Sequence, residues 1–245
     1  MNQVIDLLKS HRSIRQFSDR AIPQELIDEL VLAGQCASTS NFIQGCTVIQ
    51  VNDPGDREKL AVYAGNQSYV ARAPVFLVLC ADMQRHALAC DMHSAPMLSG
   101  YTEQFITATV DCALFAQNLI VAAESLGLGG VFIGGVRNHI AAVAELLQLP
   151  NLVFPVFGMC LGYPDQNPEL RPRLPLPVVL KQDRYDDCGD RERIEEYDQL
   201  VRDYYMTRTG GNQSTTWSEQ ICGMLGKESR PHMLKFLQGK GFLLK

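Results

Sequence analysis

The long run from Thr102 to Leu126 constrains the fold of this chain more than any other feature. Alanine, leucine, isoleucine and valine recur on nearly every face of the helix that this run predicts. A helix that is apolar all round is buried, so we expect it to be the spine of the core. The chain has 245 residues, 46% of them hydrophobic, and can enclose such a helix in one large domain or two small ones.

Strands and helices alternate around this run without regular spacing. Apolar runs predict strands at 47–51, 74–80 and 153–161, and periodic patterns predict helices at 4–8, 23–34, 57–63, 138–147, 192–205, 217–225 and 231–237. Five prolines between 163 and 177 favour an extended arm. The last quarter of the chain is more polar than the middle, and we expect it to wrap a core rather than form one.

Charge and cysteine usage exclude several functional classes. The 22 Lys and Arg against 27 Asp and Glu give a net charge of -5, so we expect no general attraction to nucleic acid or to anionic membranes. We find neither a leader peptide nor an apolar stretch approaching the ~18 residues of a spanning helix. Eight cysteines without a Cys-x-x-Cys pair favour a reducing compartment. A soluble, cytoplasmic protein is expected.

Arginine and hydroxyl side chains are concentrated in the sequence HRSIR at 11–15. The guanidinium fork matches phosphate oxygens bidentately, so this cluster is typical of a phosphate site. A solvated basic turn on a surface helix is the alternative, and these residues alone leave both open. Arg171 and Arg173, which project to one face of the extended arm, and Arg208, at the edge of a glycine-containing loop, are further basic candidates.

The glycine-rich stretch at 127–135 does not match the common nucleotide-binding loops. A Walker A loop needs Lys-Ser or Lys-Thr after its last glycine, but Val136 and Arg137 follow here. Phe132 stands where a dinucleotide fingerprint needs its third glycine. Two interpretations remain, a helix cap with a tight entry into a strand, and a backbone that closely approaches a planar ligand.

Metal and nucleophile chemistry are disfavoured by the sequence. His86, Cys90 and His93 share one face of a predicted helix, but no fourth ligand recurs nearby, so we expect no metal site. No Gly-x-Ser-x-Gly elbow occurs, and Cys160 lies in an apolar strand where a thiol is unreactive.

Five segments together resemble the major oxygen-insensitive nitroreductases and the NADPH-flavin oxidoreductases of bacteria. They are HRSIR at 11–15, AGNQ at 64–67, AAESLGLGGVFIGGVRN at 122–138, PRLP at 172–175 and TWS at 216–218. The match runs in register from about residue 3 to the C-terminus. It implies an α+β fold with a central mixed β-sheet flanked by helices, in a homodimer whose C-terminal segments cross onto the partner. It also implies a single domain over 1–245, with the arm at 163–177 and a helical tail at 190–245.

The same resemblance implies FMN as cofactor and NADPH as electron donor, with the flavin N5 and no side chain carrying the hydride. It places four residues of the first motif at the FMN phosphate and the near flavin edge, namely His11, Arg12, Ser13 and Arg15. The ribityl and dimethylbenzene side would be contacted by Ser38, Thr39 and Ser40 of the partner subunit, and the pyrimidine edge by Gln67. The isoalloxazine would be covered by Phe132, Ile133, Gly134 and Gly135, and the phosphate and pyrimidine would also be held by Arg171 and Arg173. Phe42 and Glu103 would border the substrate pocket, and Arg208 would hold the 2'-phosphate of NADPH.

Two positions depart from the family pattern. Arg171 replaces a lysine, which keeps the charge but changes the donor geometry. Gln213 replaces a second basic residue of some relatives, which leaves Arg208 alone to select NADPH. The implied activity is two-electron reduction of nitroaromatics, quinones or related acceptors by a ping-pong mechanism. The alternatives are a flavin reductase that supplies free reduced FMN, and a flavin-binding protein without turnover.

Overall fold

The computed structural model describes residues 2–245, which form two compact units. The first runs up to Asn167 and includes Arg230–Lys245, and the second is Pro168–Ser229. The helices of the first unit are α1 (Gln3–Lys9), α2 (Gln24–Gln35), α3 (Pro54–Tyr63), α4 (Ser68–Arg72), α5 (Gln84–Met92), α6 (Thr102–Ser125), α7 (Ile140–Leu146) and α11 (Met233–Gly239), with 3-10 turns at Ser40–Phe42 and Gly134–Arg137. The second unit contains α8 (Leu176–Val179), α9 (Asp190–Arg208) and α10 (Trp217–Leu225).

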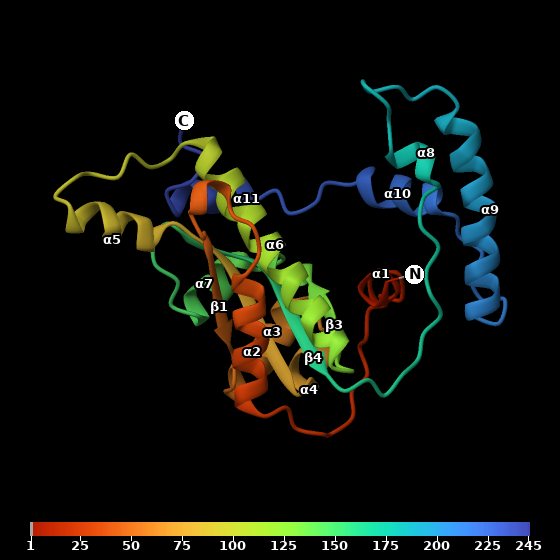
Figure 1. Ribbon diagram of the computed structural model, residues 1–245, viewed down its shortest axis with the longest axis horizontal. Coiled ribbons are helices and arrows are strands. Elements are labelled where there is room, and N and C mark those ends of the chain that lie inside the picture. Colours follow the sequence, from red (N-terminus) through yellow and green to blue (C-terminus); the bar gives the residue numbers. More distant parts are fainter. Residues whose placement is uncertain (1) are drawn as a thin grey trace. The chain divides into compact units, whose positions relative to one another are not determined.

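The strands of the first unit form one sheet in the order β1-β2-β4-β3 (Figure 1). They are β1 (Cys46–Gln50), β2 (Val75–Asp82), β3 (Gly129–Ile133) and β4 (Val153–Gly162). The expected α+β architecture is confirmed. The parallel pair that a mixed sheet needs does not occur in 2–245, where every pairing is antiparallel. The helices α3 and α4 connect β1 to β2, which pair antiparallel.

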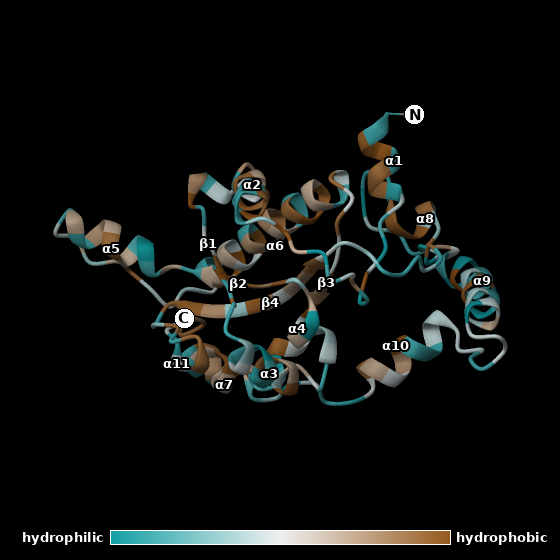
Figure 2. Cartoon of the chain, turned by 90° about the horizontal axis from the view of Figure 1, so that it is seen from below, coloured by the Kyte–Doolittle hydropathy of each residue, from teal (hydrophilic) through white to brown (hydrophobic). Residues whose placement is uncertain are grey.

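Helices cover both faces of this sheet, which explains why β2 is apolar throughout. Alternate residues of a strand point to opposite faces. Leu77 and Leu79 pack in a cluster with α2 and α6, whereas Phe76 and Val78 pack in a second cluster with α3, α4 and α7. Figure 2 shows α2 and α6 on one side of the strands and α3, α7 and α11 on the other.

Proline within a central strand is accommodated by an irregularity in the pairing. Pro155 lies in β4 at the point where the register with β2 shifts, between Leu79 and Cys80. Proline cannot donate to a ladder of hydrogen bonds, and bulges are among the few places in a sheet where it fits.

The prediction that the spine helix is buried nearly all round is wrong for the single chain. One face of α6 packs in the core, but Ile106, Val110 and Leu114 are 47, 49 and 42% exposed. These residues are spaced by four and therefore form one apolar row. α6 also has the length and composition of a spanning helix, contrary to our expectation, although its other face is the core of this fold.

Most predicted elements are confirmed, with small differences at their ends. The helix α4 was not predicted, and the extended arm ends at Pro175, where α8 begins. α9 continues to Arg208, so this residue lies in the last helical turn rather than in the loop that follows. In the second unit, α10 is fixed by a capping box between Thr216 and Glu219.

Candidate functional site

The HRSIR segment at 11–15 is extended and lies along the glycine-rich strand β3. The backbone N–H of Ile14 donates to the carbonyl of Gly130 at 2.9 Å. The Ile14 side chain is buried, and a Cβ added at Gly129 would stand 2.6 Å from its Cγ1. Glycine at 129 is therefore required by the close approach of these two segments.

The hydrogen-bond donors of this segment do not all line the same hollow. Ser10, Arg12 and Ile14 line a hollow of about 220 Å³, which also contains Asn167. Arg12 donates from Nη1 to Asn167 Oδ1 at 2.6 Å. Ser13 and Arg15 are not among the residues that line this hollow. The hollow therefore takes only part of the donors of the sequence motif.

His11 is oriented by an acidic residue of α6. Its Nδ1 lies 2.6 Å from Glu124 Oε1, and the Glu124 side chain is only 11% exposed. A carboxylate only accepts hydrogen bonds, so Nδ1 carries the proton and Nε2 remains for another partner. Our sequence analysis did not predict this role for Glu124, although an acid on an apolar helix was a visible signal.

Gln67 and Gly135 are brought together from distant parts of the chain. Gln67 donates from Nε2 to the Ala64 carbonyl at 2.6 Å and accepts from the Tyr69 hydroxyl. A Cβ at Gly135 would overlap the Ala64 carbonyl oxygen and lie 2.7 Å from Gln67 Nε2. Only glycine allows this contact, which places the 64–67 segment against the end of the glycine-rich stretch.

Phe132 is the exposed residue of an otherwise buried edge strand. Val131 and Ile133 are buried at its sides, whereas Phe132 is 37% exposed. Its ring meets the ring of Phe157 edge-on, with centroids 5.2 Å apart. The end of β3 therefore presents an aromatic surface beside the Gly134 backbone.

The loop at 38–42 is anchored to α6 by a buried carboxylate. Asp111 is 1% exposed and accepts from the backbone N–H groups of Ser40 and Gly45, each at 3.0 Å. Phe42 has a left-handed φ of 59° and is 82% exposed. Asp111 was not among the predicted site residues; an isolated acid in the apolar helix was again the only signal.

The two arm arginines belong to the second unit. Both are exposed, and the Arg171 guanidinium carbon lies 5.8 Å from the ring centroid of Tyr205. Tyr197 donates from its hydroxyl to the Pro172 carbonyl at 2.9 Å and so holds the arm on α9. Burial raises the pKa of Tyr197, and the positive charges of Arg173 and Arg171 oppose that shift.

Arg208 also belongs to the second unit. It is exposed in the last turn of α9 and donates from Nη1 to the Tyr204 hydroxyl at 3.0 Å. Its guanidinium carbon lies 5.8 Å from the Tyr204 ring centroid. The buried tyrosine therefore orients the guanidinium group of Arg208, which keeps its other donors for a further partner.

Glu103 and the histidines near 90 lie elsewhere in the first unit. Glu103 is exposed in the first turn of α6 and accepts from Thr107 at 3.5 Å. His86 Nε2 lies 2.6 Å from the Ile43 carbonyl, and His93 lies just beyond the end of α5. Across residues 2–245, no three His, Cys, Asp or Glu side chains gather as a metal site would require.

Family models match almost the whole chain. The model described as the nitroreductase family matches residues 8–163, and the model of its C-terminal domain matches residues 171–245. The chain belongs to the nitroreductase family. It is 44% identical to the NADPH-flavin oxidoreductase of Vibrio harveyi, over 98% of each chain, and 42% identical to the oxygen-insensitive NADPH nitroreductase of Salmonella typhimurium, over 99% of each. The crystal structure of nitroreductase A from Vibrio parahaemolyticus matches with a TM-score of 0.93 and 44% identity, covering all of both chains.

Proposed function

We propose that this nitroreductase-family chain is an NADPH-dependent FMN oxidoreductase that reduces nitroaromatics, quinones or related acceptors. The observation that carries this proposal is the meeting of three distant segments in the first unit. Ile14 is hydrogen-bonded to Gly130, and Gly135 packs against Gln67. These are the segments in which the family resemblance places the flavin contacts.

The donor set in the first unit fits FMN. Arg15 offers an exposed guanidinium, which suits a phosphate group. Gln67 presents an amide, which suits the alternating donors and acceptors of a pyrimidine edge. Residue 135 must be glycine, because an added Cβ would overlap the 64–67 segment, and the backbone at this position therefore carries no side chain. Arg173 and Arg171 supply further positive charge for the phosphate and the pyrimidine.

The chain positions the reactants and supplies charge. Bound FMN would supply the two-electron hydride chemistry between the nicotinamide and the acceptor. Arg15 and Arg173 stabilise negative charge at the phosphate and pyrimidine, an effect of a few kcal/mol in a partly dry site. Phe132 and Phe42 offer aromatic surface to planar acceptors, and Glu103 borders the same pocket. In this proposal both substrates use one cleft in turn, which would make the kinetics ping-pong.

The active form in this proposal is a cytoplasmic homodimer in which each chain is one functional domain. Ser38, Thr39 and Ser40 serve the flavin of the partner subunit. The apolar row of Ile106, Val110 and Leu114 supports an interface on α6, since such rows are normally covered. The C-terminal segment clasps the partner through residues 190–229, whereas Arg230–Lys245 packs in the chain's own first unit.

A flavin reductase that supplies free reduced FMN is the second candidate, and the 44% identity to an NADPH-flavin oxidoreductase favours it. A flavin-binding protein without turnover is the third. Steady-state kcat/KM values for a nitrofuran, a quinone and FMN, measured on one preparation, rank the first two. Anaerobic NADPH should bleach the flavin band of the yellow protein within seconds. A band that persists would establish the non-catalytic alternative.

Selection of NADPH is tested at Arg208. We expect Arg208→Ala to raise the KM for NADPH by about tenfold and to leave the KM for NADH within about twofold, because one charge-assisted contact to the 2'-phosphate is removed. Arg202→Ala, also on the exposed surface of α9, is the control. Equal effects on both nucleotides would remove the proposed role of Arg208.

A further inference from the structure

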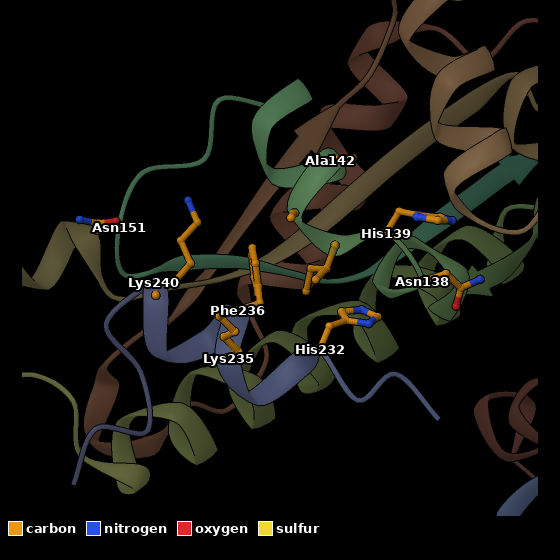
Figure 3. Close-up of a pocket in the computed structure, with 11 residues that line it drawn as sticks. Asn138, His139, Ala142, Asn151, His232, Lys235, Phe236 and Lys240 are labelled. Atoms are coloured by element: carbon orange, nitrogen blue, oxygen red, sulfur yellow. The ribbon is translucent and has the colours of Figure 1, made fainter. Parts of the chain in front are cut away.

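A hollow of about 720 Å³ lies in the first unit between α7 and α11 (Figure 3). It is lined by Asn138, His139, Ile140, Ala141, Ala142, Asn151, His232, Lys235, Phe236, Gly239 and Lys240. None of these belongs to the residues proposed to hold FMN, NADPH or the acceptor. In Figure 3, Phe236 of α11 and His232, which precedes α11, face Ala142 of α7 across the hollow.

The lining combines an apolar floor with a basic rim. Ala141, Ala142 and Phe236 provide the accessible apolar surface, over the fully buried Ile140. Every ionisable residue of the lining is a histidine or a lysine, and no carboxylate is present among these eleven described residues. This composition is unusual in a chain whose net charge is -5, and an apolar pocket with a few convergent polar groups is typical of ligand sites.

The cationic groups of the rim keep unused hydrogen-bond donors. Lys240 donates from Nζ to the carbonyls of Leu149 at 2.6 Å and Pro150 at 3.3 Å, which leaves one of its three protons free. Burial lowers the pKa of this ammonium group, as expected for a charge without a carboxylate partner. Lys235 is exposed one turn earlier on α11.

Two neighbouring polar side chains, His232 and Asn138, are each held by a hydrogen bond to the protein and keep one polar atom unused. His232 Nε2 lies 3.0 Å from the Arg137 carbonyl, so Nε2 carries the proton and Nδ1 is left over. Asn138 accepts from Arg230 Nε at 2.9 Å through its oxygen, so its amide nitrogen remains a donor. Burial and repulsion by Arg230 lower the pKa of Arg137. Positive charge therefore accumulates at this end of the hollow.

We propose that this hollow is a second binding site, which takes an organic anion with an aromatic ring. The ring covers Ala141, Ala142 and Phe236, and the acid group meets Lys235 together with the free proton of Lys240. The volume accommodates a molecule of two or more fused rings. The inference rests on this lining alone and is independent of the proposed oxidoreductase activity.

The test uses the FMN-saturated protein and 2-naphthalenesulfonate as probe, with binding measured by isothermal titration calorimetry. We expect one site per chain, and about tenfold weaker binding of the neutral 2-naphthalenesulfonamide, because the lysines require a negative charge. Inorganic phosphate should bind about tenfold more weakly than the probe as well, because it cannot use the apolar floor. Equal binding of the sulfonamide, or of phosphate, would overturn the assignment of an aromatic anion.

Two variants and one control locate the probe. Lys235→Glu should weaken probe binding by about tenfold or more through charge reversal, and Ala142→Trp should abolish it by filling the hollow. Arg202→Glu makes the same change of charge on an exposed helix of the second unit and should leave the Kd unchanged. Circular dichroism and the flavin band check that each variant is folded. An unchanged Kd in both Lys235→Glu and Ala142→Trp would exclude this site.

Discussion

Arg12 and Arg15 are three positions apart in one basic motif, yet the fold gives them different surroundings. Arg12 is bonded to Asn167 in the hollow that Ser10 and Ile14 also line. Arg15 is exposed and does not line this hollow. The residues alone left a phosphate site and a solvated turn open, and the family resemblance assigned both arginines to the phosphate, because composition does not reveal which side chains of a segment share one surface.

This difference predicts unequal effects of two alanine substitutions. Arg15→Ala should weaken FMN binding by about ten- to a hundredfold, the cost of one charge-assisted contact. Arg12→Ala should change it by less than about threefold, since Arg12 is engaged with Asn167. Flavin absorbance retained after dialysis measures both. The prediction fails if Arg12→Ala loses as much flavin as Arg15→Ala.

A second residue-scale prediction concerns the contact between Gly135 and Gln67. Gly135→Ala should destabilise the protein by about 1–3 kcal/mol, as overpacking does, and should lower FMN occupancy by displacing Gln67. Gly223→Ala is the control, because it lies in α10 with no atom within 4 Å of the added Cβ; it should be neutral or more stable by up to about 1 kcal/mol. Urea unfolding of the two variants compares these effects, and equal stabilities would contradict the close packing at Gly135.

At the scale of elements, buried carboxylates tie strands and loops to their neighbours. Asp111 of α6 holds the loop at 38–42, and Asp82 closes the end of β2. Asp82 accepts hydrogen bonds from Thr47, from Arg85 at 3.1 Å and from the Gln84 N–H at 2.8 Å. The patterns of apolar residues predicted the strands and helices themselves. They did not predict these hydrogen bonds, because no regular spacing in the sequence relates the partner residues.

Asp82 makes stability depend on pH. Burial alone would raise its pKa, but the hydrogen bonds from Thr47 and Arg85 outweigh burial and the pKa is lowered. A carboxyl group whose pKa is lowered by folding stabilises the fold at pH values above its ordinary pKa near 4. This stabilisation is lost as the pH falls through the pKa of the folded state. Asp82→Asn should therefore cost about 1–3 kcal/mol at pH 7, with a smaller deficit below pH ~4.

Urea unfolding of the wild type, Asp82→Asn and Asp91→Asn at pH 7 and at a pH of about 2.5 to 3, below the ordinary carboxyl pKa, measures this dependence. Asp91 is exposed on α5, so its substitution should change stability little at either pH. A deficit of Asp82→Asn that is the same at both pH values would show that the carboxylate charge is not the cause.

At the scale of the whole molecule, the sequence predicted a helix buried on nearly every face, and the single chain buries only one side of it. The apolar row of Ile106, Val110 and Leu114 explains the difference. These side chains are apolar as the prediction required, but nothing within the described chain covers them fully. A second copy of the chain, as proposed above, would restore the burial that the composition of α6 indicates.

Val110→Asp tests this assembly. An unpaired carboxylate in the interface should raise the dimer dissociation constant by roughly a hundredfold or more, so sedimentation velocity should detect monomers at micromolar concentration. Val62→Asp, on the exposed surface of α3, is the matched control, since Val62 is 57% exposed; it should remain dimeric. A dimeric Val110→Asp protein would place the interface elsewhere.

Local periodicity and composition predicted the order of helices and strands, the burial of β2 and the segments that carry basic and glycine residues. The family resemblance also indicated the cofactor. The contacts of the folded chain were needed to show that Arg12 but not Arg15 lines the hollow beside Asn167, that Gly135 closes on Gln67, that Asp111 anchors the 38–42 loop and that the strand pairs described in 2–245 are antiparallel. Each of these depends on contacts between segments far apart in the chain, where neither period nor composition records which atoms will meet.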